Sequence, residues 1–310
     1  MDRILTIIGP TAAGKTEVSL EIAKKICGEI ISADSRQIYK YLDIGTAKPT
    51  VKERREINFH LIDFVDPDGN YSCGQFRRDA EAKIEEIIKR KNMPIICGGT
   101  GLYIKALFNP LHDLPQSDKR LKESLAQLLQ KHGIDYLYKK LLTIDPQWAK
   151  RIMPNDKQRI LRGLEVYKIT GKPISQLIKR KNMKAKYQPY YIGLNLPREE
   201  LYQRIDQRFD LMVKKGLVEE VESLLRRGFD SNSSALRTIG YLEIIEYLKG
   251  RLTLDDARTK AKQRTRNFAK RQITWFSKIP DLVWFDPEKS DLAKIIIELF
   301  LKSTTCRRAF

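Results

Sequence analysis

Apolar positions in the first third of the chain follow two alternating periods. Short β-branched runs predict strands at Ile4–Ile8, Glu29–Ala33, Phe59–Val65 and Pro94–Cys97. Amphipathic stretches between them predict helices at about Lys15–Ile26 and Gln75–Lys91. Strands that alternate with helices are typical of a parallel sheet that is covered by helices on both faces. The front of the chain is therefore predicted to be an α/β domain.

The pattern changes near residue 114 and changes back near residue 187. In between, a helical period dominates, with breaks at Pro146, Pro154 and Pro173 and no convincing strand. Beyond it we expect strands at Tyr190–Leu196 and Leu282–Phe285 and a long helix at about Leu254–Ser277. The predicted organisation is a first part of the core at 1–113, an all-helical insertion at 114–187, a return to the core with basic helices at 188–302, and a loose tail at 303–310.

The charge of the chain is concentrated in its second part. Apolar residues make up 42% of the sequence, which is enough for a buried core and excludes a disordered protein. The formal net charge is +19. Residues 1–110 hold 17 basic and 15 acidic side chains, whereas residues 111–310 hold 41 and 24. Such an excess indicates a polyanionic partner for the second part.

Cysteine usage and hydropathy predict a cytoplasmic protein. The cysteines are far apart and form no CxxC pair, which argues against a disulfide scaffold or a zinc site: Cys27, Cys73, Cys97 and Cys306. The first apolar stretch is too short for a signal peptide or a membrane span, and no later stretch approaches that length. For the same reason we expect no association with membranes. No coiled-coil seam is present, so we expect a monomer.

A phosphate-binding loop follows the first predicted strand. Residues 9–16 read GPTAAGKT, a full match to the pattern G-x-x-x-x-G-K-[ST], and a predicted helix follows. In such a loop backbone N–H groups surround phosphate oxygens, the lysine adds a cation, and the hydroxyl can bind Mg²⁺. The alternative is a chance glycine-rich turn. The residues predicted to bind a di- or triphosphate are Gly9, Pro10, Thr11, Ala12, Ala13, Gly14, Lys15 and Thr16, with Thr16 as the metal ligand.

This loop and the alternation of elements predict a P-loop NTPase-like α/β fold with three layers, a parallel sheet core and an inserted all-helical subdomain. No NKxD string is present, which disfavours a GTPase. The strand at Pro94–Cys97 ends in glycines rather than in an acid, which disfavours a hydrolytic ATPase.

Asp34 follows the second predicted strand. Because the carboxyl ends of parallel strands line the ligand crevice, we expect Asp34 to face the phosphate loop. There a carboxylate can accept a proton from an incoming nucleophile. Capping of the next helix is an equally good explanation of the pattern.

Eight sequence blocks in order resemble the tRNA dimethylallyltransferase family, also called tRNA isopentenyltransferases. The first four are GPTAAGKT, SADSRQIYKYLDIGTAKP, HLIDFVDPDGNYSCGQFRRDA and GGTGLYIKAL. The others are PNDKQRILRGLEVYKITGK, RIDQRFDLMVKKGLVEEV, TIGYLEI and TRNFAKRQITWF. The resemblance spans nearly the whole chain up to about Phe285, and it is far more specific than the phosphate loop alone.

The resemblance implies transfer of the dimethylallyl group from dimethylallyl diphosphate to the exocyclic N(6) amine of adenosine 37, next to the anticodon of tRNA. The phosphate loop would then hold the diphosphate of the donor, with Mg²⁺ as cofactor, and Arg208 could reach the same group. The Asp-rich DDxxD clamp of many other prenyltransferases is absent. We expect the base to enter one side of a channel and the donor to enter the other.

The resemblance also assigns roles to single residues. Asp34 would be the general base, and Lys15 would act on the leaving diphosphate. Thr100 would lie near the reacting centre, with capping of the helix at Gly101 as the alternative. The residues implied to contact tRNA are Asp34, Ser35, Arg36 and Gln37 in the core, and Gln158, Arg159, Ile160, Leu161 and Arg162 in the insertion.

The long late helix is predicted to carry an unpaired basic stripe. Its basic residues repeat every four positions and suit a phosphate backbone, with a solvated face as the alternative: Arg258, Lys262, Arg266 and Lys270. Its buried face is predicted to consist of Ala257, Ala261, Phe268 and Trp275. In the insertion, Asn155 and Gln158 form a plausible capping pair.

Three other functions share parts of this pattern. A small-molecule kinase would have the same phosphate loop but would not need so basic a second part. A prenyltransferase that acts on free adenine nucleotides would have no use for the basic insertion or for TRNFAKRQITWF. A non-enzymatic RNA-binding protein would not need an intact Lys15, Thr16 and Asp34.

Overall fold

The computed structural model describes residues 3–109, 114–178 and 185–305. The chain divides into two compact units. The first combines residues 1–108 with 185–310, and the second comprises residues 109–184. The insertion predicted at 114–187 covers most of the second unit.

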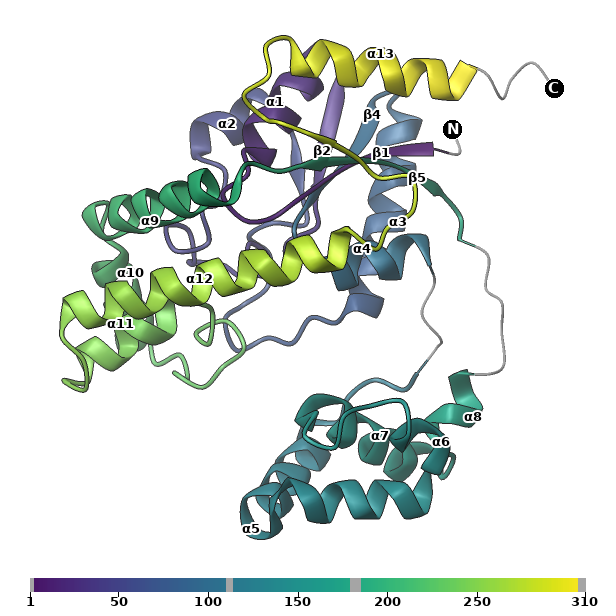
Figure 1. The fold of residues 1–310 in the computed structure, drawn as a ribbon, viewed down its shortest axis with the longest axis vertical. Helices are drawn as coiled ribbons and strands as arrows, with labels where there is room; N and C mark the ends of the chain where they lie inside the picture. The colour runs from purple at the N-terminus through teal and green to yellow at the C-terminus, as the bar shows by residue number, and fades with distance from the viewer. Residues whose placement is uncertain (1–2, 110–113, 179–184, 306–310) are drawn as a thin grey trace. The chain divides into compact units, whose positions relative to one another are not determined.

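The first unit is built on a six-stranded sheet in which every strand pair is parallel (Figure 1). The strands are β1 (Arg3–Ile8), β2 (Gly28–Ser32), β3 (Phe59–His60), β4 (Met93–Gly98), β5 (Gln188–Leu194) and β6 (Val283–Phe285). Their order in the sheet is β3-β2-β4-β1-β5-β6. The predicted α/β fold with a parallel sheet is confirmed.

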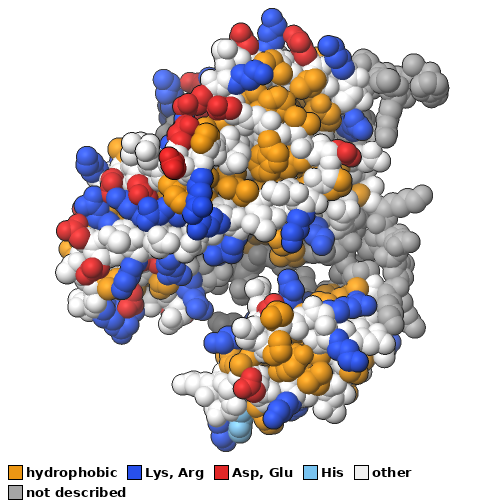
Figure 2. All heavy atoms as spheres, viewed as in Figure 1, with side chains coloured by type: hydrophobic (Ala, Val, Ile, Leu, Met, Phe, Trp, Pro, Cys, Tyr) orange, Lys and Arg blue, Asp and Glu red, His pale blue; other side chains and the backbone are white. Residues whose placement is uncertain are grey.

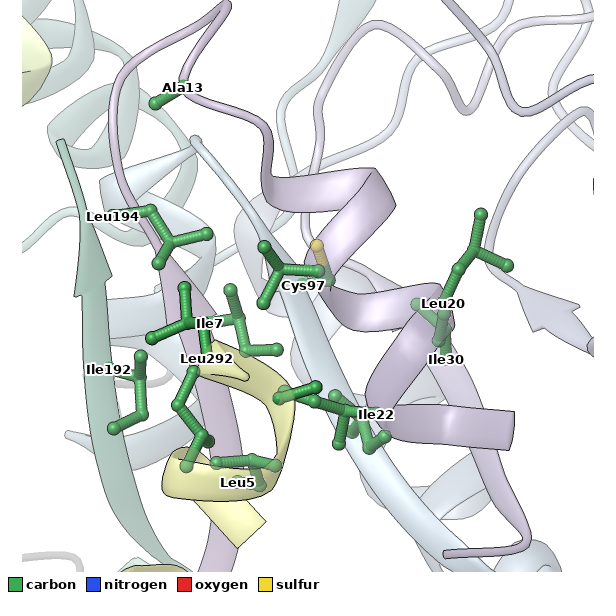
Figure 3. Close-up of a cluster of buried hydrophobic side chains, with 14 of the residues drawn as sticks. Leu5, Ile7, Ala13, Leu20, Ile22, Ile30, Cys97, Ile192, Leu194 and Leu292 are labelled. Atoms are coloured by element: carbon green, nitrogen blue, oxygen red, sulfur yellow. The ribbon is translucent and has the colours of Figure 1, made fainter. Parts of the chain in front are cut away.

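Helices cover both faces of the sheet because apolar side chains alternate along the central strands. Leu5 and Ile7 of β1 pack into the core under α1 (Lys15–Lys25) and α13 (Leu292–Thr305), as Figure 3 shows. Ile4 and Ile8 point to the other face, where they pack with α3 (Cys73–Lys89) and α4 (Gly101–Phe108). A period of two thus assigns each apolar residue of β1 to one layer.

A second core of the first unit lies away from the sheet. It includes buried residues from α9 (Arg198–Lys214), α10 (Leu217–Arg226), α11 (Tyr241–Leu248) and the start of α12 (Leu254–Phe276), together with residues of the segments 38–42 and 235–236. The other end of α12 reaches the sheet, where Ala269 and Phe276 are buried. The helix therefore connects the two cores. A short helix that the sequence reading missed, α2, spans Val51–Glu56.

The described part of the second unit is all helical. Its helices are α5 (Lys119–Ile144), α6 (Pro146–Ala149), α7 (Lys157–Thr170) and α8 (Ile174–Ile178). A kink in α5 lies at Gly133, whose φ is 77°. Leu137 and Leu141 of α5 and Ile160 and Leu164 of α7 form its core. No helix in the described ranges is long and apolar enough to cross a membrane.

Two expectations about elements were wrong. The third strand ends at His60 and not at Val65, because Leu61 and Asp63 adopt positive φ angles of 57° and 61°. The apolar character of this stretch reflects burial of Leu61 rather than an extended backbone. The predicted tail at 303–310 is helical up to Thr305, because α13 buries Ile296 and Phe300 at helical spacing. Residues 306–310 lie outside the described residues.

Candidate active site

The candidate site lies at the carboxyl ends of β1, β4 and β2, where the sequence predicts that Asp34 faces the phosphate loop. These neighbouring strands lead into the loop at 9–16, into Gly99 and Thr100, and into residues 33–37. The backbone joins the last two segments, because Thr100 donates to the carbonyl of Ala33 at 3.1 Å. Segments that are far apart in the sequence thus meet at one edge of the sheet.

The loop at 9–16 has the geometry of an anion cradle. At Gly9, where φ is 153°, a Cβ atom would lie 2.2 Å from the carbonyl oxygen of Leu194, so only glycine fits. Helix α1 begins at Lys15, directly after the loop. Its first N–H groups and its positive dipole end favour a negatively charged group at this point. Residues 11–16 of the loop line a cavity together with Glu17 and Val18.

Two half-buried cations flank the cradle. The ammonium of Lys15 donates to the Pro10 carbonyl at 2.6 Å, and the Arg208 guanidinium donates to the Thr11 hydroxyl at 2.5 Å. Burial lowers the pKa of both groups, although the Asp34 carboxylate opposes the shift in each case. Burial disfavours their charged forms, so an anion bound between them would restore favourable electrostatics. Arg208 therefore joins the cradle from α9.

Two cavities meet beside the cradle. The cradle cavity has a volume of about 780 Å³ and contains Lys15, Thr16 and residues 43–44 and 46–51 in its wall. The helix-side cavity, of about 490 Å³, is lined by α12 and by residues 237–239. The walls share five residues, which mark the junction: Thr11, Asp34, Thr46, Arg208 and Met212.

Asp34 lies at this junction and has two sides. Its Oδ1 accepts hydrogen bonds from the backbone N–H groups of Arg36 at 2.8 Å and Gln37 at 3.4 Å. Residues 35–38 form a turn and not a helix, so the predicted helix cap was wrong, and Oδ1 fixes this turn instead. No residue in the described ranges donates a hydrogen bond to Oδ2, and the carboxylate lines both cavities. One carboxylate oxygen fixes the turn while the other can accept a proton.

Thr100 and Ser35 form a pair next to Asp34. The Thr100 hydroxyl accepts a hydrogen bond from the Ser35 N–H at 2.9 Å and lies 3.3 Å from the Ser35 hydroxyl. Both residues line the helix-side cavity with Asp34. The pair therefore places two hydroxyl groups beside the carboxylate.

Arg36 and Gln37 hold neighbouring loops. Arg36 donates to the Ser234 carbonyl at 2.6 Å and lines the helix-side cavity. The Gln37 amide nitrogen donates to the carbonyls of Thr46 and Ala47 at 3.3 and 3.1 Å, and its oxygen accepts from Ser32. The amide of Gln37 is therefore engaged by the protein itself.

Gln272 on α12 is a site residue that the sequence reading missed. Its side chain is buried; Oε1 accepts from the Thr11 N–H at 2.8 Å and Nε2 donates to the Gly99 carbonyl at 2.9 Å. The amide thus bridges the phosphate loop and the loop that carries Thr100. Gln272 stands in the TRNFAKRQITWF block, but nothing in its local pattern sets it apart.

The prediction that Phe268 and Trp275 lie on the buried face of α12 was wrong. These side chains are 37% and 42% exposed, and Phe268 lines the helix-side cavity with Asn267 and Arg271. The buried residues of α12 are Ala257, Ala261, Ala269, Gln272 and Phe276. The alanines belong to hydrophobic clusters, and the Gln272 amide is satisfied by the backbone of Thr11 and Gly99.

The prediction of an unpaired basic stripe on α12 was also wrong. Arg258 and Lys262 form ion pairs with Asp210, at 2.7 and 2.8 Å. Further along, Arg266 pairs with Asp206 at 3.0 Å, and the Lys270 ammonium lies 5.9 Å from the ring centre of Tyr202. The partners belong to α9 and repeat every four residues, so the two helices pair along their length. On the face drawn in Figure 2, acidic side chains lie among the basic ones over these two helices.

In the second unit the five residues implied to contact tRNA divide into two groups. Gln158 and Arg159 are exposed, and Arg159 pairs with Asp156 at 3.4 Å. The other three serve the unit itself. Ile160 is fully buried and Leu161 packs against the same core. Arg162 donates to the Pro115 carbonyl and to the buried Glu165 carboxylate, at 2.6 Å in each case.

The predicted capping pair of Asn155 and Gln158 was wrong by one residue. Asp156 is the N-cap of α7, and its Oδ1 accepts a hydrogen bond from the Arg159 N–H at 3.0 Å. Both Asn and Asp are good capping residues, so their adjacency made the register ambiguous.

The fold and the site together define a P-loop α/β enzyme whose phosphate cradle opens toward a carboxylate and a second cavity. A family model described as IPP transferase matches residues 37–279. The chain therefore belongs to the IPP transferase family, which confirms the resemblance seen in the sequence.

Named relatives and solved structures agree. The chain is 48% identical over 287 residues to a tRNA dimethylallyltransferase of Thermoanaerobacter sp. (strain X514), with 91% of each chain covered. It is 47% identical over 296 residues to that of Carboxydothermus hydrogenoformans, with 95% of each covered.

The crystal structure of a tRNA isopentenylpyrophosphate transferase from Bacillus halodurans has a TM-score of 0.71 and 37% identity, and the match covers 100% of this chain and 98% of that one. A eukaryotic dimethylallyltransferase acting on tRNA has a TM-score of 0.80 and 31% identity, covering 94% of this chain and 75% of that one.

Proposed function

We propose that this enzyme transfers the dimethylallyl group of dimethylallyl diphosphate to the N(6) amine of adenosine 37 in tRNA, next to the anticodon, and releases diphosphate. One observation carries the proposal. Asp34, with one carboxylate oxygen free of protein donors among the described residues, lies where the cradle cavity and a second cavity meet. Such an arrangement can bring a diphosphate ester and an amine together at a base.

The cradle side suits the donor. As the allylic C–O bond breaks, negative charge develops on the diphosphate. The phosphate-loop N–H groups, Lys15 and Arg208 surround the place where that charge accumulates. Interactions that strengthen as charge develops lower the barrier more than interactions with the intact donor do.

Thr16 is suited to hold Mg²⁺. Thr16 lies in the first turn of α1 and lines the cradle cavity. The described residues contain no cluster of three or more His, Cys, Asp or Glu side chains that could bind a metal by themselves. The Thr16 hydroxyl would therefore be the protein ligand, and oxygens of the bound diphosphate would be further ligands. Mg²⁺ prefers such oxygen donors. When bound, Mg²⁺ would neutralise charge on the leaving diphosphate.

The junction suits the acceptor. The exocyclic amine of adenine is a weak nucleophile because the ring delocalises its lone pair. A hydrogen bond to Asp34 Oδ2 would raise its reactivity, and the carboxylate would take the proton as the C–N bond forms. The Thr100 and Ser35 hydroxyls lie beside Asp34 and can orient the amine. A base drawn out of the anticodon loop would enter by the helix-side cavity.

The RNA surface that the structure favours differs from the predicted stripe. Arg36, Arg237 and Arg271 line the helix-side cavity, whereas Arg264, which also lines it, pairs with the buried Glu243 carboxylate. In the second unit Gln158 and Arg159 are exposed. We assign the phosphate contacts to Arg36, Arg237, Arg271, Gln158 and Arg159, because Arg264 and the basic residues of α12 that pair with α9 are already compensated. A single chain lines both cavities and the acceptor is tRNA, so we propose a cytoplasmic monomer.

Labelled dimethylallyl diphosphate tests the function. The enzyme is incubated with the donor, Mg²⁺ and either tRNA or free AMP, ADP and ATP, and we expect label only in tRNA. Label on free nucleotides would instead support a nucleotide prenyltransferase. Transfer of phosphate from γ-labelled ATP to a small molecule would support a kinase, and tRNA binding without any transfer would support a binding protein.

A further inference from the structure

Residues 42–48, here called the partition loop, form the wall between the two cavities. Gly45 and Thr46 line the helix-side cavity, and Asp43, Ile44 and Thr46–Lys48 line the cradle cavity. Thr46 belongs to both walls, as Asp34 does. The position of this loop therefore determines the shape of the space in which donor and acceptor would meet.

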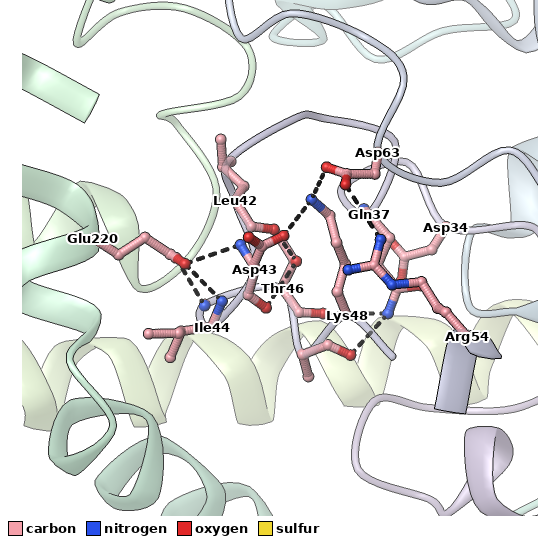
Figure 4. Close-up of polar contacts among 12 residues, drawn as sticks. Asp34, Gln37, Leu42, Asp43, Ile44, Thr46, Lys48, Arg54, Asp63 and Glu220 are labelled. Atoms are coloured by element: carbon pink, nitrogen blue, oxygen red, sulfur yellow. Dashed lines mark hydrogen bonds and ion pairs between the residues drawn. The ribbon is translucent and has the colours of Figure 1, made fainter. Parts of the chain in front are cut away.

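One side of the partition loop is fixed by a carboxylate from α10. Glu220 accepts hydrogen bonds from three successive backbone N–H groups, those of Asp43 at 3.0 Å, Ile44 at 2.8 Å and Gly45 at 3.3 Å (Figure 4). Consecutive N–H groups that converge in this way form a nest for an anion. Both carboxylate oxygens of Glu220 accept hydrogen bonds from N–H groups of the loop. The interaction therefore needs the carboxylate, because it requires two oxygens that accept.

Tyr241 holds Glu220 in turn. Its hydroxyl donates to the Glu220 carboxylate at 2.5 Å. Burial, together with the Glu220 charge, raises the pKa of Tyr241 well above its ordinary value, so the phenol stays a donor. A Cβ atom at Gly45 would lie 2.3 Å from the Tyr241 ring, so the loop backbone packs directly on this tyrosine.

The other side of the partition loop is fixed by a buried lysine. The Lys48 ammonium, whose side chain is 1% exposed, lies 2.7 Å from both the Asp43 and the Asp63 carboxylates. Arg54 pairs with the other oxygen of Asp63, as Figure 4 shows. The Gln37 amide holds the middle of the loop. The loop is therefore fixed at both ends before any substrate binds.

We propose that Glu220, which lines neither cavity, is a positioning residue that keeps the partition loop closed around the reacting carbon and excludes water from it. This inference rests on the proposed dimethylallyl transfer. In that reaction the allylic C–O bond breaks, diphosphate leaves with the electron pair, and the amine forms the C–N bond and gives a proton to Asp34. With the loop released, a water oxygen bonds to the same carbon and loses a proton, which yields dimethylallyl alcohol and diphosphate.

The ratio of dimethylallyl alcohol to prenylated tRNA tests this role. Both products come from donor labelled in the dimethylallyl group, so their ratio does not depend on how much of a variant is folded. Glu220→Gln keeps the size of the side chain but turns an amide N–H₂ toward N–H groups of the loop. We expect the ratio to rise about tenfold and kcat to fall, with tRNA affinity unchanged, because a small displacement at the reacting centre is enough to misplace the acceptor. Tyr241→Phe should raise the ratio less.

Glu222→Gln is the matched control on the same helix. Glu222 is exposed and its ion pair is with Arg226, at 3.8 Å, so this variant should keep the ratio of the wild type. The inference is overturned if Glu220→Gln keeps that ratio, or if Glu222→Gln raises it as much. A wild-type enzyme that leaves tRNA unlabelled contradicts the proposed function and the inference with it. Labelled tRNA together with an unchanged ratio in Glu220→Gln contradicts the inference alone.

Discussion

At the scale of single residues, Asp34 serves the fold and the chemistry with different oxygens. Its sequence pattern fits a helix cap and a general base equally well, and the structure shows a turn at residues 35–38 in place of the helix. Oδ1 accepts the backbone N–H of Arg36, whereas Oδ2 accepts no hydrogen bond from the rest of the described chain. Sequence reading could therefore name Asp34 but could not divide its roles. Gln272 could not be predicted as a site residue, because its hydrogen-bond partners Thr11 and Gly99 are distant in the sequence.

Asp34→Asn should separate the two roles. The amide keeps an oxygen that can accept the Arg36 N–H, so the turn should remain intact, but it cannot take a proton. We expect kcat to fall by about 10²-fold or more while tRNA affinity stays within a factor of about two. Single-turnover transfer and tRNA binding, measured on the same preparation, check this. Near-normal turnover would remove Asp34 from the chemistry.

At the scale of elements, α12 has three faces with separate partners. Ala257 and Ala261 face the helical core, the basic stripe faces α9, and Asn267 and Phe268 face a cavity. A four-residue repeat of basic residues identified the stripe, but it could not reveal the acids of α9, which are 48–60 residues away in the chain. Local periods predict which residues share a face, whereas what covers that face depends on tertiary packing.

Asp210→Asn tests whether the stripe is structural. The variant removes the charge that compensates Arg258 and Lys262. Because these pairs are partly exposed, we expect the free energy of unfolding to drop by only about 1 kcal/mol and tRNA affinity to change less than about twofold. Urea unfolding and tRNA binding provide the measurements. Asp255→Asn is the control, since Asp255 is 91% exposed and pairs only with its helical neighbour Arg258 in the described structure. A large gain in tRNA affinity for Asp210→Asn would mean that the basic stripe of α12 does bind RNA.

A buried carboxylate ties three elements at the edge of the sheet and should make stability depend on pH. Glu29 at the start of β2 is 2% exposed and contacts His60, Arg90 and Asn92. Burial opposes its charge, but the hydrogen bonds from Arg90, Asn92 and His60 outweigh burial and lower its pKa to about 2. Because the pKa is lower in the folded state, this contribution is complete above the unfolded pKa and is lost as the pH falls toward 2.

Glu29→Gln should therefore change acid unfolding. At pH 7 the variant is expected to be less stable than the wild type, because Arg90 loses its buried partner. The difference should shrink as the pH falls from about 4.5 to about 2. Over this range the Glu29 carboxylate takes up a proton when the wild type unfolds, and near pH 2 it is protonated in the folded state as well. Urea unfolding followed at several pH values measures it. A difference that stays constant across this range would mean that the charge of Glu29 does not stabilise the fold.

At the scale of the whole molecule, the change in periodicity and the uneven charge predicted two parts of different character, and the chain divides close to those positions. The charge could not say which basic residues meet solvent. In the second unit, Arg159 and Arg162 lie on the same helix, yet Arg159 is 58% exposed and Arg162 pairs with a carboxylate that is only 3% exposed. Whether an arginine can bind RNA or instead stabilises its own unit depends on its contacts in the folded structure. Arg162 contacts Pro115, which is 47 residues away in the sequence, and Glu165, which is three residues away.

These two arginines should respond differently to substitution. Arg159→Ala removes an exposed cation, so tRNA affinity should fall and the slope of log K against log salt should decrease by about 1, with no change in thermal unfolding. Arg162→Ala leaves Glu165 buried without its cation, so the second unit should lose stability. Binding of tRNA at several salt concentrations, together with thermal unfolding, distinguishes the two. If Arg162→Ala unfolded like the wild type and lowered the salt slope, Arg162 would have to contact tRNA directly, and its bonds to Pro115 and Glu165 would be dispensable to the fold.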